Sequence, residues 1–328
     1  MAEQIHIEPG GDKPNQDVFA ETLQRLAASD RNVIAVTSDS RGSGKLVPFG
    51  KQFPQQIVEV GIAEQNLVGV AAGLGSCGKK VFAVSPACFL TARSLEQIKN
   101  DICYSNHPVT VVGISAGVSY GALGSTHHSL HDFAVLRAIN NITIVAPADN
   151  FETEKATELA AASGTPVYLR FGKKIMPALK AKNNDSFVFG KGRIITEGND
   201  VAIIANGETV YPAVQAGALL KEQNIEATVV SMHTIKPLDT VLIESLARKC
   251  KAIVTVEEHS IYGGLGEAVA SFLMQLKSPS TGGVWGGSFK IIGIPDEYTV
   301  TGSQIEIFNH YGISKEGIAS EVLKLIQQ

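Results

Sequence analysis

The chain lacks the features that define several large classes of protein. Its four cysteines show neither CxxC spacing nor a paired framework, so we expect reduced thiols. Apolar runs such as residues 109–114 are too short to span a bilayer, and the polar segment 1–17 has no apolar core of a secretory signal. The formal charge is −4, without a stripe of Lys and Arg. We therefore expect a soluble, cytoplasmic protein that binds neither nucleic acid nor membrane.

The chain does have the composition of a well-buried globular protein. It is 328 residues long, 44% hydrophobic and 18% charged, which suffices for two domains. Short β-branched runs alternate with helix-like segments, a pattern that indicates a parallel sheet covered by helices on both faces. In the first half the predicted strands are 33–37, 56–60, 80–84, 109–114, 142–145 and 167–170, and the predicted helices are 17–28, 64–75, 91–103, 130–139 and 150–161.

The alternation breaks at residues 172–192, where Lys, Asn and Pro cluster as in an exposed linker. We expect a doubly wound α/β domain over residues 1–178 and a smaller one over 190–328. Catalytic residues should lie at the carboxyl ends of the strands, and residues 277–287 should form a surface loop. The second domain is predicted to have strands 200–205, 226–231, 252–257 and 289–293, and helices 209–222, 238–249, 266–275 and 314–325.

Residues 60–66, VGIAEQN, place Glu64 where an apolar strand passes into a helix. Such a glutamate can simply favour the helix start, or it can be perturbed by burial for chemistry. Gly61 permits a tight entry to the helix. The following VGVAAGLG is poor in helix propensity, so close packing against another segment is its expected reason.

A long run carries a family resemblance. Residues 59–102, EVGIAEQNLVGVAAGLGSCGKKVFAVSPACFLTARSLEQIKNDI, are similar to the pyrimidine-binding domain of the transketolase family of thiamine diphosphate enzymes. The similarity is greatest to separately encoded carboxy-terminal transketolase sections and extends over residues 17–325. It implies that Glu64 hydrogen-bonds the N1′ nitrogen of the cofactor's aminopyrimidine. There the carboxyl promotes removal of the proton from the thiazolium carbon.

Residues 121–132, GALGSTHHSLHD, allow three interpretations. The first is a capped helix start with surface histidines. The second is a zinc site, because His127 with His131, and His128 with Asp132, have the i, i+4 spacing of ligands on one helical face. In the third, the segment resembles the family loop in which a histidine faces the substrate.

The third interpretation gives His127 a catalytic role. It would stabilise the developing alkoxide of the donor carbonyl or relay its proton, and His128 would be a further substrate contact. The sequence departs from the family at Leu123, where an aspartate usually reads a donor hydroxyl, and at Ser115, where a histidine is usual. Because leucine cannot accept a hydrogen bond, donor identity should differ from that of typical transketolases.

The resemblance also assigns cofactor and anion contacts. Phe89 matches an aromatic residue that lines the aminopyrimidine slot, and Asp39, just after the first strand, is expected to contact the cofactor. Ser43 matches a phosphate-binding serine. Arg170 matches an arginine that clamps the same group with its fork, and Arg93 is a further basic candidate.

Residues 254–266, VTVEEHSIYGGLG, form a strand followed by a glycine-rich turn. A lone GGxG could be a nucleotide-binding turn, but the signal is weak. The segment is similar to one in the family's carboxy-terminal domain that supports the dimer and the domain interface. We therefore interpret it as structural.

The chain has no GDG motif followed by the asparagine that holds the diphosphate through Mg²⁺. The resemblance therefore implies half of an enzyme, with the Mg²⁺ ligands on an amino-terminal partner subunit in an α2β2 heterotetramer. The expected activity is transfer of a two-carbon ketol unit from an anionic ketose to an aldose. The alternatives are the β subunit of a 2-oxoacid dehydrogenase, a non-catalytic regulatory subunit and a zinc hydrolase.

Overall fold

The computed structural model describes residues 13–181, 186–276 and 285–327. Its strands are β1 (Val33–Thr37), β2 (Ile57–Glu59), β3 (Lys80–Pro86), β4 (Val109–Ile114), β5 (Thr143–Val145), β6 (Val167–Arg170), β7 (Arg193–Thr196), β8 (Val201–Ala205), β9 (Ala227–Ser231), β10 (Thr234–Lys236), β11 (Ala252–Ser260) and β12 (Ser288–Ile294). Its α-helices are α1 (Asn15–Ser29), α2 (Val47–Gln52), α3 (Glu64–Ser76), α4 (Ala87–Arg93), α5 (Leu95–Gln97), α6 (Asp132–Arg137), α7 (Asn150–Ala162), α8 (Val210–Lys221), α9 (Thr240–Lys249), α10 (Leu265–Leu273), α11 (Gln304–His310) and α12 (Lys315–Ile326).

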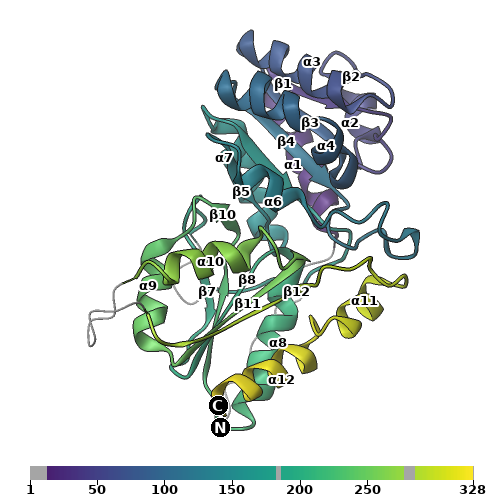
Figure 1. Cartoon of the computed structure of the whole chain (residues 1–328). Helices are drawn as coiled ribbons and strands as arrows, with labels where there is room; N and C mark the ends of the chain where they lie inside the picture. The colour runs from purple at the N-terminus through teal and green to yellow at the C-terminus, as the bar shows by residue number, and fades with distance from the viewer. Residues whose placement is uncertain (1–12, 182–185, 277–284, 328) are drawn as a thin grey trace.

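The chain builds two sheets, each covered by helices (Figure 1). The first has seven strands in the order β10-β5-β6-β4-β3-β1-β2, and the second has five in the order β12-β11-β8-β9-β7. Neighbouring strands are parallel except at one edge of each sheet, where β10 pairs with β5 and β7 pairs with β9 in antiparallel orientation. The predicted fold class, two α/β domains with mostly parallel sheets, is confirmed.

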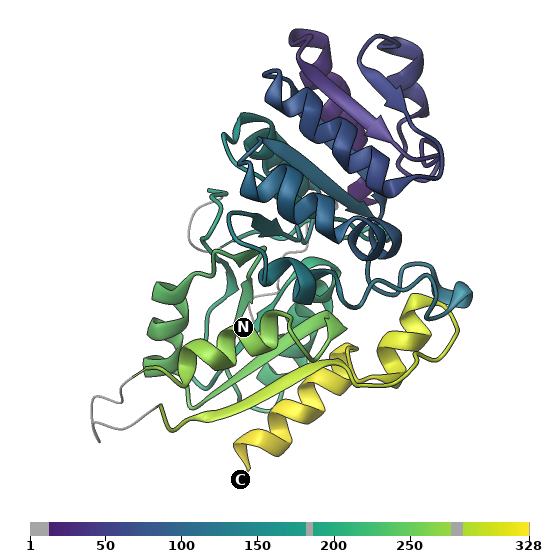
Figure 2. The ribbon, with the colours of Figure 1, turned by 45° about the horizontal axis from the view of Figure 1, so that its top comes forward.

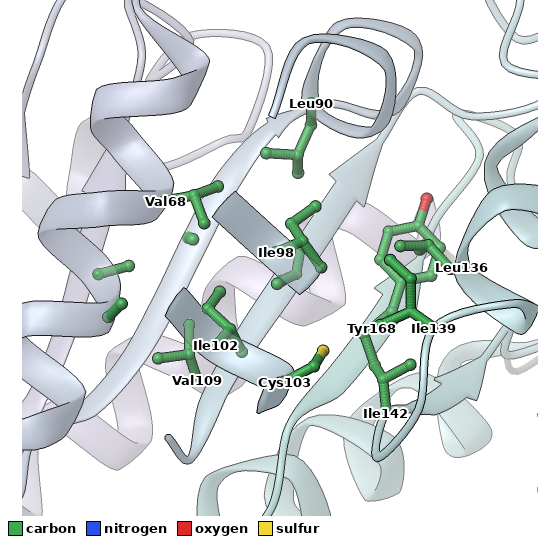
Figure 3. Packing of buried hydrophobic residues seen from close by; sticks show 14 of the residues in the cluster. Val68, Leu90, Ile98, Ile102, Cys103, Val109, Leu136, Ile139, Ile142 and Tyr168 are labelled. Carbon is green, nitrogen blue, oxygen red and sulfur yellow. The ribbon is translucent and has the colours of Figure 1, made fainter. Parts of the chain in front are cut away.

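Alternation along β3 explains why helices cover both faces of the first sheet. Val81 and Ala83 point into an apolar cluster with residues of α3, α4 and α6. Phe82 and Val84 point the other way, into a cluster with residues of α1 and α7. Because successive side chains of a strand face opposite sides, a strand buried on both faces is apolar throughout. Figure 3 shows part of the first cluster, with Val68 of α3 and Leu90 of α4 near each other.

One strand crosses between the domains. β10 follows β9 of the second sheet, yet it pairs with β5 of the first sheet, where Thr234 is the partner of Val145. The next peptide bond, Lys236–Pro237, is cis. The sequence analysis did not predict this strand, since three residues show no periodicity. The first domain is therefore completed by a segment of the second.

The helix predicted over residues 91–103 is divided in the structure. α4 ends at Arg93, and the chain continues through α5 into a π-helical turn, Ile98–Tyr104. Hydroxyl groups compete with the backbone here, because Thr91 donates to the carbonyl of Ala87 and Ser94 to that of Leu90. Such bonds disturb the regular helical pattern.

The segment predicted as an exposed linker is packed where it is described. Met176, Leu179 and Phe187 are buried, and the Leu179 amide donates to the Asp149 carboxylate over 2.8 Å. The expectation of exposure is wrong for these residues. Residues 1–12 of the predicted first domain and 277–284 of the predicted surface loop lie outside the described residues. Among the described residues, no helix is long and apolar enough to cross a membrane.

Candidate active site

The candidate residues lie at the carboxyl ends of the parallel strands of the first sheet. Glu64 follows β2, Phe89 and Arg93 follow β3, and His127 lies in the loop after β4. In a parallel sheet these ends meet along one edge, where α/β proteins usually bind ligands. The sequence therefore folds so that separate segments contribute neighbouring side chains.

Glu64 is the first residue of α3, and only 5% of it is exposed. The Arg93 Nη1 atom donates to its Oε1 atom over 2.8 Å. The Arg93 guanidinium also lies over the Phe89 ring, with Cζ 4.4 Å from the ring centroid. One arginine thus contacts both residues that the resemblance assigns to the aminopyrimidine, and a buried carboxylate with a cation beside it is far less costly than one alone.

The row of side chains continues from Phe89 toward β6. The His127 ring stands edge-on to Phe89, with centroids 5.3 Å apart, and edge-on to Tyr120 at 5.5 Å. The Lys173 Nζ atom lies 3.8 Å from the Tyr120 ring centroid. His127 Nδ1 is 3.0 Å from the Thr126 hydroxyl, and the histidine is partly exposed. The structure therefore brings Glu64, Phe89 and His127 together, as predicted.

The far end of this row gathers groups suited to an anion. Burial raises the pKa of Tyr120, while interactions with the side chains of Ser43 and Ser115 act in the opposite direction. Burial and the nearby charge of Lys45 lower the pKa of Lys173. Ser43 is thus close to an aromatic hydroxyl and two lysines. Sequence reasoning missed Tyr120, Lys45 and Lys173, although Lys173 follows a predicted strand end.

Asp39 lies after β1 and is exposed. Its backbone has a φ of 53°, and its amide donates to the Glu59 carboxylate over 2.7 Å. The amide of Gly61, at the entry to α3, donates to the same carboxylate. Glu59 therefore ties the loop that carries Asp39 to the turn that leads into Glu64.

Two family models match the chain. The model described as "Transketolase, pyrimidine binding domain" matches residues 13–178, and "Transketolase, C-terminal domain" matches residues 190–318. The chain belongs to the transketolase family. One of the two subunits of an apulose-4-phosphate transketolase from Phocaeicola vulgatus is 47% identical over 94% of this chain and 96% of its own length. A putative transketolase C-terminal section of Methanocaldococcus jannaschii is 37% identical over 93% of this chain and 94% of its own length.

A solved structure of the same type agrees. A split-gene transketolase, described as an inactive β4 tetramer, superposes with a TM-score of 0.83 at 32% identity, covering 96% of this chain and 98% of that one. The chain is thus the carboxy-terminal subunit of a split transketolase and part of a transferase, and its counterpart is an amino-terminal subunit. These relatives do not favour the 2-oxoacid dehydrogenase alternative. The transketolase family implies dependence on thiamine diphosphate.

Arg170 does not lie where the sequence analysis expected it. Its side chain is 5% exposed, and its Nε atom donates to Asp132 Oδ2 over 2.8 Å. Its Nη2 atom donates to the carbonyls of Ser129 and Glu258. A guanidinium engaged by these protein oxygens cannot offer its fork to a substrate. The assignment of Arg170 as an anion clamp is wrong; it joins β6 to α6 and to the second domain.

His128 is also placed differently from the prediction. Only 4% of it is exposed, and its Nε2 atom donates to the carbonyl of Gly121 over 3.0 Å. Its Nδ1 atom is 2.6 Å from the Thr299 hydroxyl, from which it accepts. Burial lowers the pKa of the ring, which favours its neutral form. With both nitrogens engaged, His128 fastens its loop to the second domain and does not contact substrate.

The zinc interpretation required the histidines to share a helix. α6 begins only at Asp132, so residues 127–131 precede it. His127 lies against Phe89, while His131 Nε2 is 3.4 Å from the Thr91 hydroxyl. In the described part of the chain, no group of three or more His, Cys, Asp or Glu side chains could hold a metal.

The glycine-rich turn after β11 binds a side chain of its own chain. The Glu257 carboxylate accepts from the amides of Leu265 and Gly266, at the start of α10. Its burial raises the pKa to about 7. The Glu257 carboxylate lies where a nucleotide phosphate would bind at this helix terminus. The geometry favours the structural interpretation of the turn.

Proposed function

We propose that this subunit, with its amino-terminal partner, transfers a two-carbon ketol unit from a phosphorylated ketose to an aldose. The observation that carries the proposal is the continuous row from Glu64 through Arg93, Phe89 and His127 to Tyr120. A buried carboxylate and an aromatic face stand at one end, and hydrogen-bonding and cationic groups stand at the other. Such a row suits a cofactor ring beside an anionic substrate.

The cofactor end fits an aminopyrimidine. Glu64 offers a carboxylate to a ring nitrogen, and the half-buried Phe89 offers a flat apolar face. When bound, thiamine diphosphate would supply the carbon nucleophile and electron sink for the transfer. Glu64 would hold or move a proton at the pyrimidine nitrogen, and Arg93 would orient both Glu64 and Phe89. Asp39, which is exposed at the end of β1, is proposed as a further cofactor contact.

The substrate end is assigned to the donor. His127 would donate to or accept from the oxygen of the donor carbonyl, because its ring faces the space beside Phe89. Lys173, Lys45 and Ser43 would bind the phosphate, in place of the expected Arg170. Two relatives, 47% and 39% identical, are subunits of apulose-4-phosphate transketolases. We therefore propose apulose 4-phosphate as the donor. The exposed Leu123 is consistent with a changed donor contact.

The diphosphate and Mg²⁺ contacts are proposed to lie on the partner, in a subunit with a GDG…N motif. Two copies of each chain would then make two complete sites. In the described residues this chain presents no carboxylate cluster for a metal, so a divided site accounts for both halves of the cofactor.

The test is reconstitution from the two purified subunits. We expect ketol transfer from apulose 4-phosphate and stoichiometric thiamine diphosphate only when both are present. Size-exclusion chromatography with light scattering should then give the mass of two copies of each. Equal turnover by this chain alone would contradict the division of the site. Faster turnover with a different ketose phosphate would contradict the donor.

A further inference from the structure

The two loops that carry the substrate-facing groups are each held by a buried glutamate of the second domain. The loop after β4 donates its Val118 amide to Glu258 Oε1 over 2.9 Å. The loop after β6 donates its Lys174 amide to Glu208 Oε1 over 2.9 Å. Tyr120 lies two residues beyond the first bond, and Lys173 immediately precedes the second. Each contact therefore acts directly on the backbone that positions a candidate substrate residue.

A single side chain joins the two glutamates. The Gln304 Nε2 atom donates to Glu258 Oε1 and to Glu208 Oε2, both over 2.7 Å. Glu208 and Gln304 are 5% exposed and Glu258 is 2% exposed. Burial and repulsion by Glu208 raise the pKa of Glu258, and burial raises that of Glu208. Arg170 is the nearby cation that opposes both effects. Two carboxylates in one buried place are costly, so their retention calls for a role.

The fit between loop backbone and carboxylate is tight on both sides. A Cβ atom on Gly117 would lie 2.2 Å from the Glu258 carboxyl carbon, and one on Gly172 would lie 2.2 Å from Glu208 Oε1. Gly117 also has a φ of +61°, which side chains rarely adopt. Since the backbone lies directly against each carboxylate, a shift of either carboxylate must shift its loop.

Gln304 is itself fixed in place. It is the first residue of α11, where Ser303 and Glu306 form a capping box. Just before that, the Thr299 hydroxyl lies 2.9 Å from the Ser125 hydroxyl and contacts His128. Figure 2 shows α11 beside the loop after β4. The start of α11 therefore has a set position relative to that loop.

We propose that Glu258, Gln304 and Glu208 form a positioning bridge, by which the second domain sets the separation of the two substrate loops. The bridge fixes the 3.8 Å approach of Lys173 to Tyr120 and so tunes affinity for the anionic end of the donor. Its members touch neither substrate nor cofactor. Only the naming of a phosphorylated donor rests on the proposed function.

The test replaces Gln304 with methionine, which has a similar length and no amide. The matched control is Gln215→Met, since Gln215 of α8 lines the same cavity of about 320 Å³ and bonds Tyr211 instead of the glutamates. Hydrogen exchange of both assembled complexes is followed in peptides that cover Val118 and Lys174. We expect exchange about tenfold faster in both peptides in Gln304→Met and unchanged exchange in Gln215→Met.

Kinetics give the second readout. In Gln304→Met, KM for the phosphorylated donor should rise about tenfold while kcat stays within about twofold, because the bridge acts on donor binding. Gln304→Asn keeps the amide but cannot span both carboxylates, and it should behave like Gln304→Met if the latter fails to assemble. Unchanged exchange in both loops, or equal loosening in the control, would overturn the bridge. Absence of ketol transfer in the wild-type complex would instead contradict the proposed function, and the exchange result would still decide.

Discussion

The guanidinium group of Arg93 donates to the carboxylate of Glu64 over 2.8 Å while it lies over the ring of Phe89. An ion pair between two long side chains is usually of little worth at a surface, but here one partner is 5% exposed. Because the guanidinium is planar, it can fix a carboxylate at its edge and an aromatic ring at its face. The candidate cofactor slot is therefore built from its own chain before any ligand enters.

Glu64→Gln tests the carboxylate. We expect the complex to assemble with the partner as before and the turnover number to fall at least about 100-fold, since an amide cannot move a proton at the pyrimidine nitrogen. Steady-state kinetics and light scattering are the measurements. Glu96→Gln, at an exposed site of the same domain, is the control and should keep full activity. Turnover within about twofold of the wild type would remove Glu64 from the mechanism.

Arg93→Lys tests the double contact. Lysine keeps the positive charge beside Glu64 but lacks the flat group that covers Phe89, so we expect weaker holding of the cofactor ring. The apparent Kd of thiamine diphosphate in the reconstituted complex should rise about tenfold, measured by cofactor titration of the apo-complex. Arg25→Lys makes the same change at an exposed pair with Glu154 and Glu158. It should leave the Kd unchanged, and equal effects at both sites would argue against the role.

Lys173→Met tests the anion end. KM for a phosphorylated ketose should rise about tenfold, because a charge-assisted contact to phosphate is lost. KM for a ketose without phosphate should not change, which separates charge from shape. Lys51→Met, at an exposed position on α2, serves as the control. If KM rose equally for both donors, Lys173 would act on the fold of its loop and not on the anion.

The cysteines give a prediction that needs no substrate. Cys77 is exposed, while Cys88, Cys103 and Cys250 are buried. Burial raises the pKa of Cys88 and of Cys103 to about 11, so both stay protonated at pH 8, and it also raises that of Cys250. In titration with a disulfide reagent at pH 8, we expect one fast thiol in the native chain and four in guanidinium. A second fast thiol would show that one of these buried sites opens.

Local patterns predicted much of the fold and part of the site. The bounds of β1, β4 and β6 agree with the predicted ranges, because continuous β-branched runs bounded by turns leave little ambiguity. Glu64 begins its helix as predicted. The sequence could not place Arg170, because its partner Asp132 lies 38 positions away and nothing local states which face of the sheet a strand end presents. Tyr120 and Lys173 were missed for the same reason.

The strand β10 has a consequence for how the two domains can be separated. A gene divided between residues 178 and 190 would leave β5 at an unpaired edge of the first sheet, because its neighbour is encoded beyond the cut. An unprotected edge strand invites pairing with other chains and aggregation. The pyrimidine-binding half expressed alone should therefore be insoluble, and inheritance of both halves as one unit follows from three residues of antiparallel pairing.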